Sequence, residues 1–79
     1  MKVKIFSLND GLTEYNDVIS IKLVSKDYNL LILKDYIPII GEVEGSIELK
    51  YQDNNLLMEN IFAYYMNQDN VFNIIIKEK

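Results

Sequence analysis

Glu42 and Glu44 are the two residues of this 79-residue sequence whose spacing comes nearest to a catalytic pair. In an extended segment, residues two apart share a face, and two carboxylates in a cleft can act as general acid and general base. The same glutamates stand between Gly41 and Gly45. Because glycines at both ends are typical of a turn or loop, we expect the pair to lie in a solvated loop and not in a catalytic site.

The composition of the chain argues against most other kinds of catalytic site and metal site. The chain has no histidine and no cysteine, so the common nucleophile–base pairs and the preferred zinc ligands are missing. Asp53 and Asp69 lie beside asparagines but lack the spacing of a calcium loop, and turn formation explains them better. There is no glycine-rich phosphate motif. The sequence therefore predicts a non-catalytic chain with no catalytic residues, no metal site and no cofactor.

The charged residues argue against two classes of partner. The formal net charge is −4, and all eight basic residues are lysines. Arginine is the usual residue for recognising phosphate and guanine, so its absence disfavours nucleic-acid binding. The apolar runs are too short to span a bilayer, and the N-terminus lacks the features of a signal peptide. We therefore expect a cytoplasmic protein that is not inserted in a membrane.

Short alternating segments separated by polar turns predict an all-β fold. Strands are predicted at 2–8, 17–25, 30–33, 46–51 and 71–76, with turns at 9–11, 25–29, 52–55 and 67–70. The clearest strand is the fourth, whose alternation places Ile47, Leu49 and Tyr51 on one face. The second strand should likewise bury Ile19, Ile21 and Leu23. The continuous apolar run 30–33 is expected to be buried on both faces.

The segment 56–66 fits either a helix or a strand. Helical spacing would align Leu57, Ile61, Tyr64 and Tyr65, whereas strand spacing would align Leu56, Met58, Phe62, Tyr64 and Met66. Because turns flank the segment and aromatic residues are frequent in it, we expect a strand. The chain, residues 1–79, is then expected to form a single domain, a small two-sheet β-sandwich or barrel of short, mostly antiparallel strands.

Tyrosine and proline indicate where a partner could bind. Six tyrosines are many for this length, and tyrosine suits interfaces because it joins apolar area to a polar tip. Tyr51 and Tyr64 are expected in the core or half-buried, while Tyr28 and Tyr36 are equally consistent with partner contact and with surface packing. Pro38, the only proline, interrupts an apolar run and should end a strand ladder there.

The order of segments over residues 18–45 resembles a known family. The segments are VISIKLV, SKDY, NLLILKDYIPII and GEVEG. The N-terminal β-sandwich of the epsilon subunit of F-type ATP synthases carries a strand like V-x-x-I-x-V, a turn, then G-x-L-G-I-L-P-G-H-A-P-L and a short strand ending in P-G. The proline of H-A-P falls on Pro38, its histidine on Tyr36, and P-G on Glu44 and Gly45. The two glycines of G-x-L-G-I have no counterpart here.

The resemblance implies a non-catalytic subunit of a rotary F-type or F-like ATPase. Such a central-stalk subunit would dock on a gamma-like subunit and couple the catalytic alpha and beta subunits to a membrane rotor ring, and hence to proton transport, or to another load. It would lie in the cytoplasm or on the inner face of a bacterial membrane, as part of the complex. The missing glycines and the missing histidine suggest a divergent branch, such as an ATP-synthase-like motor of wall-less bacteria.

The sequence ends after the sandwich strands, so we expect no C-terminal helical hairpin and assign none of the hairpin's ATP-binding or inhibitory activity. The residues expected to contact the partner lie in the proline segment and its flanks: Tyr36, Ile37, Pro38, Ile39 and Glu42. The alternative is a free-standing small β-barrel adaptor, unrelated to ATPases, that binds another protein through a sheet edge or its tyrosines. A small enzyme would require a pocket with converging polar groups.

Overall fold

The computed structural model describes residues 1–77, which form seven β-strands and no helix. The strands are β1 (Lys2–Ser7), β2 (Gly11–Tyr15), β3 (Val18–Ser25), β4 (Asn29–Leu33), β5 (Ile39–Tyr51), β6 (Asn54–Gln68) and β7 (Val71–Ile76). They form one sheet in the order β2-β1-β7-β6-β5-β3-β4. Neighbouring strands are antiparallel, apart from the parallel pair β1 and β7. The predicted all-β fold of mostly antiparallel strands is confirmed.

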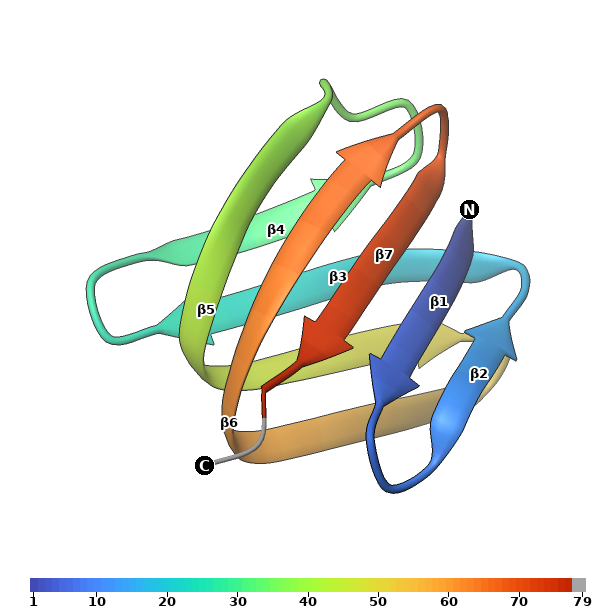
Figure 1. Ribbon diagram of the computed structural model, residues 1–79. Coiled ribbons are helices and arrows are strands. Elements are labelled where there is room, and N and C mark those ends of the chain that lie inside the picture. Colours follow the sequence, from blue (N-terminus) through green and yellow to red (C-terminus); the bar gives the residue numbers. More distant parts are fainter. Residues whose placement is uncertain (78–79) are drawn as a thin grey trace.

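This single sheet makes two layers because its two longest strands, β5 and β6, bend sharply (Figure 1). At the bend the β5–β6 register shifts between Gly45 and Ile47, and Asn60 has a φ of 55°. A bulge of this kind adds a residue to one strand and increases the local twist. We call the layer of β2, β1, β7, the second half of β6 and the first half of β5 the front layer. The remaining halves of β5 and β6 form the back layer with β3 and β4.

The hydrophobic core lies between the two layers and draws on both. Its buried side chains are Val3, Ile5, Val18, Ile21, Leu23, Ile32, Val43, Ile47, Leu49, Ala63, Tyr65, Phe72 and Ile74. The rings of Tyr65 and Phe72 stack with centroids 5.6 Å apart. Burying a large apolar side chain contributes about 1.5–3 kcal/mol, so this cluster is the main source of stability.

The faces predicted from alternation are confirmed where the strands are regular. Ile47 and Leu49 are fully buried, and Tyr51 is half-buried. Ile21 and Leu23 are also fully buried in β3. A period of two residues is therefore a reliable guide to burial within an uninterrupted strand.

Two burial predictions are wrong, one because the back layer has a solvent-exposed face and one because of a bulge. The run 30–33 forms most of β4, but only one face of the back layer meets the core, so alternate residues of β4 point to solvent. Ile32 is therefore buried, whereas Leu31 and Leu33 are 53% and 49% exposed. Ile19 is 54% exposed because the β3–β5 register shifts beside it.

The ambiguous segment before the last turn lies in β6, so the strand interpretation is confirmed and the helical one is wrong. The strand face predicted for it is wrong beyond Asn60, where the bulge exchanges the inward and outward residues. Met58 packs against the core before the bulge, and Tyr65 is buried after it. Tyr64 and Met66, predicted to share a face with Met58, are 45% and 40% exposed.

Two stretches are strands where alternation predicts none, although the epsilon resemblance predicts a short strand ending at Gly45. Residues 11–15 form β2, and residues 39–45, which carry Glu42 and Glu44, form the first half of β5. The two glutamates therefore point outward from a paired strand and not from a loop, because their backbone is held by β6. Pro38 lies at the end of a ladder, as predicted, since the last β5–β6 pair is Ile39 with Asn67 and β5 begins at the residue that follows the proline.

Tyr28 joins the two layers from the β3–β4 turn, just before β4. Its hydroxyl donates a hydrogen bond to the carbonyl oxygen of Glu42 at 2.6 Å and lies 2.9 Å from the hydroxyl of Tyr65. Partial burial, followed by the hydrogen bond with Tyr65, raises the pKa of Tyr28 well above its ordinary value. The group is therefore neutral at physiological pH. Tyr28 therefore packs within the chain, and no contact with a partner is needed to explain a tyrosine at this position.

Candidate partner-binding surface

The outer face of the front layer carries a row of exposed apolar side chains that crosses four strands. Leu12 of β2 lies opposite Phe6 of β1, and Phe6 lies opposite Ile75 of β7. Ile75 in turn lies opposite Tyr64 of β6. These four side chains are between 45% and 59% exposed, so the row is open to solvent.

The row continues to β5 through Met66. Met66 lies two residues after Tyr64 and opposite Ile40, whose side chain is 79% exposed. We call these six side chains the apolar strip: Leu12, Phe6, Ile75, Tyr64, Met66 and Ile40. Contiguous apolar surface of this kind, shared by five neighbouring strands, is uncommon on soluble monomers and marks interaction sites.

Two adjoining hollows lie along the apolar strip. One, of about 230 Å³, is lined by Ile40, Tyr64 and Met66 together with Ile75. The other, of about 360 Å³, lies over β1 and β2 and is also lined by Met66 and Ile75. Interface side chains that carry most of the binding energy are those that fill such depressions. The strip therefore has a shape that can receive side chains of another protein.

Charged side chains border the strip. Lys4 on β1 lies 4.0 Å from the carboxylate of Glu14 on β2. Lys77 donates a hydrogen bond to the hydroxyl of Tyr64 at 3.1 Å, and its ammonium lies 4.6 Å from the centre of that ring. Exposed ion pairs contribute little to stability, but an apolar centre with a polar rim is the usual composition of a protein interface.

The five residues predicted to contact a partner lie beside the β5 end of the strip. Ile37, 66% exposed, and Pro38 are in the loop between β4 and β5. Glu42 is exposed on β5. Tyr36 and Ile39 are half-buried and pack against the core, so they are less accessible than the other three. Their contact with a partner remains a prediction.

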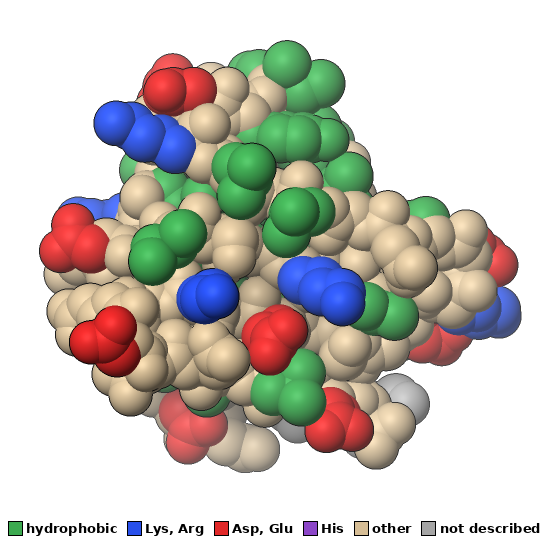
Figure 2. All heavy atoms as spheres, turned by 180° about the vertical axis from the view of Figure 1, so that it is seen from behind, with side chains coloured by type: hydrophobic (Ala, Val, Ile, Leu, Met, Phe, Trp, Pro, Cys, Tyr) green, Lys and Arg blue, Asp and Glu red, His purple; other side chains and the backbone are tan. Residues whose placement is uncertain are grey.

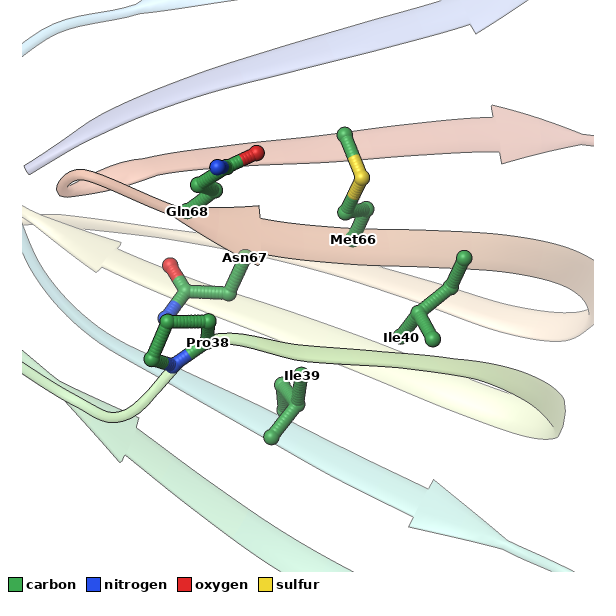
Figure 3. A pocket seen from close by; sticks show the side chains of 6 residues that line it. All are labelled: Pro38, Ile39, Ile40, Met66, Asn67 and Gln68. Carbon is green, nitrogen blue, oxygen red and sulfur yellow. The ribbon is translucent and has the colours of Figure 1, made fainter.

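A third hollow, of about 290 Å³, joins this loop to the strip (Figure 3). It is lined by Pro38, Ile39, Ile40, Met66, Asn67 and Gln68. Figure 3 shows Ile40 and Met66 side by side on neighbouring strands, with Pro38 next to Asn67. Because Ile40 and Met66 belong to the strip, the proline loop and the strip form one continuous surface.

Polar side chains hold the proline loop in place from β6 and from the β6–β7 turn. The buried Asn67 donates from its amide to the carbonyl oxygens of Tyr36 and Ile37, at 3.4 and 3.2 Å. Asn70 accepts from the backbone N–H of Asp35 at 2.7 Å and donates to its carboxylate at 2.9 Å. The loop conformation therefore depends on side chains about thirty residues away in sequence.

Replacing Asn67 with alanine is expected to lower the free energy of unfolding by about 1–3 kcal/mol, because two loop carbonyls lose their donor. Urea denaturation followed by circular dichroism measures the change. Asn73→Ala is the control, since Asn73 is half-buried on the outer face of β7. Equal losses in the two variants would show that Asn67 does not hold the loop.

The outer face of the back layer has a different character. One row across it reads Leu31, Lys22, Glu48 and Leu57, so charged residues separate its exposed leucines. Figure 2, seen from behind, shows lysine and acidic side chains across the middle and lower part of the molecule, with hydrophobic side chains gathered in the upper part. The row of apolar side chains that no charged residue interrupts is the one on the front layer.

Glu42 and Glu44 line a hollow of about 310 Å³ beside the β3–β4 turn. Several polar groups that line this hollow are already paired with one another. The Ser25 hydroxyl accepts a hydrogen bond from the Glu44 N–H at 3.0 Å, and the Lys26 ammonium lies 3.8 Å from the Glu44 carboxylate. Residues 1–77 contain no group of three or more acidic, histidine or cysteine side chains placed to hold a metal ion. In the same residues, no helix has the length and apolar character to cross a membrane.

Comparison with known proteins shows similarity in fold. No protein-family model matches the sequence, and no curated protein matches it in sequence. The structure is similar to a chain in the cryo-EM structure of the Tetrahymena thermophila mitochondrial ATP synthase central stalk/c-ring, with a TM-score of 0.78 and 13% sequence identity. The match covers 99% of this chain, which spans 63% of the length of the Tetrahymena chain. At this identity the two chains share a fold.

Proposed function

We propose that this protein is a non-catalytic, epsilon-like subunit of the central stalk of a rotary F-type or F-like ATPase. The observation that carries the proposal is the apolar strip on the front layer, which a stalk subunit needs for docking on its neighbour. Two further observations support it. The fold is similar to that of a chain from an ATP synthase central stalk/c-ring. The order of strands around Pro38 and Gly45 resembles the epsilon family.

The composition of the apolar strip is more typical of a surface that a permanent partner covers than of one that stays in contact with solvent. Its aromatic members, Phe6 and Tyr64, belong to types that are frequent in protein interfaces. A chain of this length buries only about 60% of the surface that its unfolded form exposes, so an isolated domain is marginally stable. Covering the strip would add apolar burial that the core alone does not provide. The proposed partner of this face is a gamma-like subunit.

In this role the protein performs no chemistry of its own. It transmits rotation between a catalytic head of alpha- and beta-like subunits and a load, which in an ATP synthase is the membrane rotor ring. Its location is then the inner face of the membrane, as part of the complex. The missing glycines of the epsilon pattern support a divergent branch, such as a motor of wall-less bacteria.

Co-expression with the gamma-like subunit from the same genome tests the proposal. We expect the two chains to elute together in size-exclusion chromatography at a one-to-one ratio, because burial of the strip drives association. If this chain is folded by circular dichroism and elutes alone, the proposal fails and the adaptor alternative is favoured. Neighbouring genes for alpha-, beta- and gamma-like chains would add support.

A further inference from the structure

The two edge strands of the sheet differ in their protection against further pairing. Within residues 1–77 the sheet ends at β2 on one side and at β4 on the other. An edge strand offers unpaired N–H and C=O groups to other chains, and natural proteins guard such edges with charges, prolines or bulges. The β2 sequence GLTEY contains Glu14, which pairs with Lys4. The β4 sequence NLLIL has no charge and no proline, so it is unguarded.

The β3–β4 turn fixes which backbone groups of β4 point outward. Ser25 and Tyr28 are hydrogen-bonded to each other in both directions, at 2.8 and 3.4 Å. In an antiparallel pair, hydrogen-bonded residues recur at every second position. From the β3–β4 register, Leu30 and Ile32 therefore bond to β3. The residues between them direct their N–H and C=O groups away from β3.

The outward residues of β4 are Asn29, Leu31 and Leu33. The Leu33 carbonyl accepts from the N–H of Tyr36 at 3.2 Å in the turn that follows, whereas Asn29 and Leu31 lie along the open edge. Leu31 and Leu33 also expose about half of their side chains on the outer face. The edge thus combines backbone donors and acceptors with two apolar side chains, the combination by which extended segments are bound.

We infer that β4 is a strand-addition site at which an extended segment of the gamma-like partner joins the sheet. This inference rests on the proposed function and adds a second contact to the apolar strip. The charged pair Lys26–Asp27 precedes β4 and the charged pair Lys34–Asp35 follows it, so the stretch of edge without charged residues is short. The segment that fits is a run of about five uncharged residues, apolar at alternate positions, because every second side chain lies beside Leu31 and Leu33.

A second copy of this chain fits the edge poorly. Antiparallel pairing of two β4 strands centred on Leu31 would place Asp27 directly opposite Asp35 of the other copy. Like charges directly opposite each other destabilise a sheet. A ladder of five residues also buries far less than the roughly 1,200 Å² of a stable interface. The occupant is therefore a segment of a different protein that also contacts this chain elsewhere.

Amide hydrogen exchange measured by NMR on the co-expressed complex tests the inference. In the free chain we expect slow exchange at Leu30 and Ile32, which bond to β3, and fast exchange at Leu31 and Leu33. In the complex, exchange at Leu31 and Leu33 should slow by at least about tenfold. Fast exchange at both residues in an intact complex overturns the inference and leaves the proposed function standing. Failure of the wild-type chains to associate overturns the proposed function as well.

Two variants separate strand addition from folding. Leu31→Pro removes an N–H that faces outward, so the ladder to β3 remains, and Leu31→Lys adds a charge at the same place. Both should weaken gamma-like subunit binding by about tenfold or more in calorimetry, whereas Thr13→Lys on the edge strand β2 should not. Equal affinities for Leu31→Lys and Thr13→Lys contradict the inference. The free chain alone provides a further test. If amide exchange at Leu31 becomes slow when the free chain is concentrated, the edge pairs with a second copy, and this result also overturns the inference.

Discussion

Gly45→Ala is expected to lower the free energy of unfolding by about 3–5 kcal/mol, a large share of the total for a chain of this size. Gly45 lies at the bend of β5, where the strand passes from the front to the back layer. A Cβ atom there would collide with the carbonyl oxygen of Val24 on β3. The obstacle is backbone held in a ladder and cannot rotate away as the end of a side chain would, so the two strands must separate.

Gly11→Ala is the matched control for this prediction. Gly11 has a φ of 70°, but a Cβ at this position meets no atom within 4 Å. Only the conformational term then remains, about 1 kcal/mol. Urea denaturation of both variants, followed by circular dichroism, compares the two losses. A loss at Gly45 no larger than that at Gly11 would show that the bend tolerates a side chain.

The sequence predicts the regular strands of this fold but not its irregularities. Alternation identifies the buried face of 46–51 because that strand is uninterrupted and packs on the core with one face. It fails beyond Asn60, since a bulge exchanges inward and outward residues there. The mark in the sequence is Asn60 itself, a residue type that tolerates the positive φ found at the bulge. Alternation also fails for 30–33, because the back layer meets the core with one face only and leaves Leu31 and Leu33 exposed on the other. A continuous apolar run does not reveal that its second face is uncovered.

The sequence predicts only part of the candidate site, because the rest depends on which strands become neighbours in the fold. The proline loop stands out because Pro38 interrupts an apolar run. The apolar strip depends on the parallel pairing of β1 with β7, which brings Phe6 beside Ile75 from opposite ends of the chain. One signal is present: Phe6 lies at a position of β1 that shares a face with Lys2 and Lys4, where a polar residue is expected. The apolar residue on this polar face is the mark in the sequence of the candidate interaction surface.

A substitution at the centre of the apolar strip is the second change for which we expect a large effect, here on partner binding. Ile75→Glu should weaken binding of the gamma-like subunit by about 30- to 1,000-fold, the range for a central interface residue worth roughly 2–4 kcal/mol. Ile75 lines both hollows of the strip, so a glutamate there would place an unpaired charge in the desolvated centre of the interface. Isothermal titration calorimetry measures the affinity. Because the side chain is 52% exposed, the melting temperature of the isolated chain should change little.

Leu57→Glu separates this effect from a general effect of added negative charge. Leu57 is 51% exposed on the outer face of the back layer, so the substitution has the same chemistry and nearly the same exposure as Ile75→Glu. It should leave the affinity unchanged, because Leu57 on β6 belongs neither to the apolar strip nor to the edge strand β4. Equal weakening by both variants would show that binding depends on net charge and not on the strip. Weakening by Leu57→Glu alone would move the docking face to the back layer, where the leucines are separated by Lys22 and Glu48.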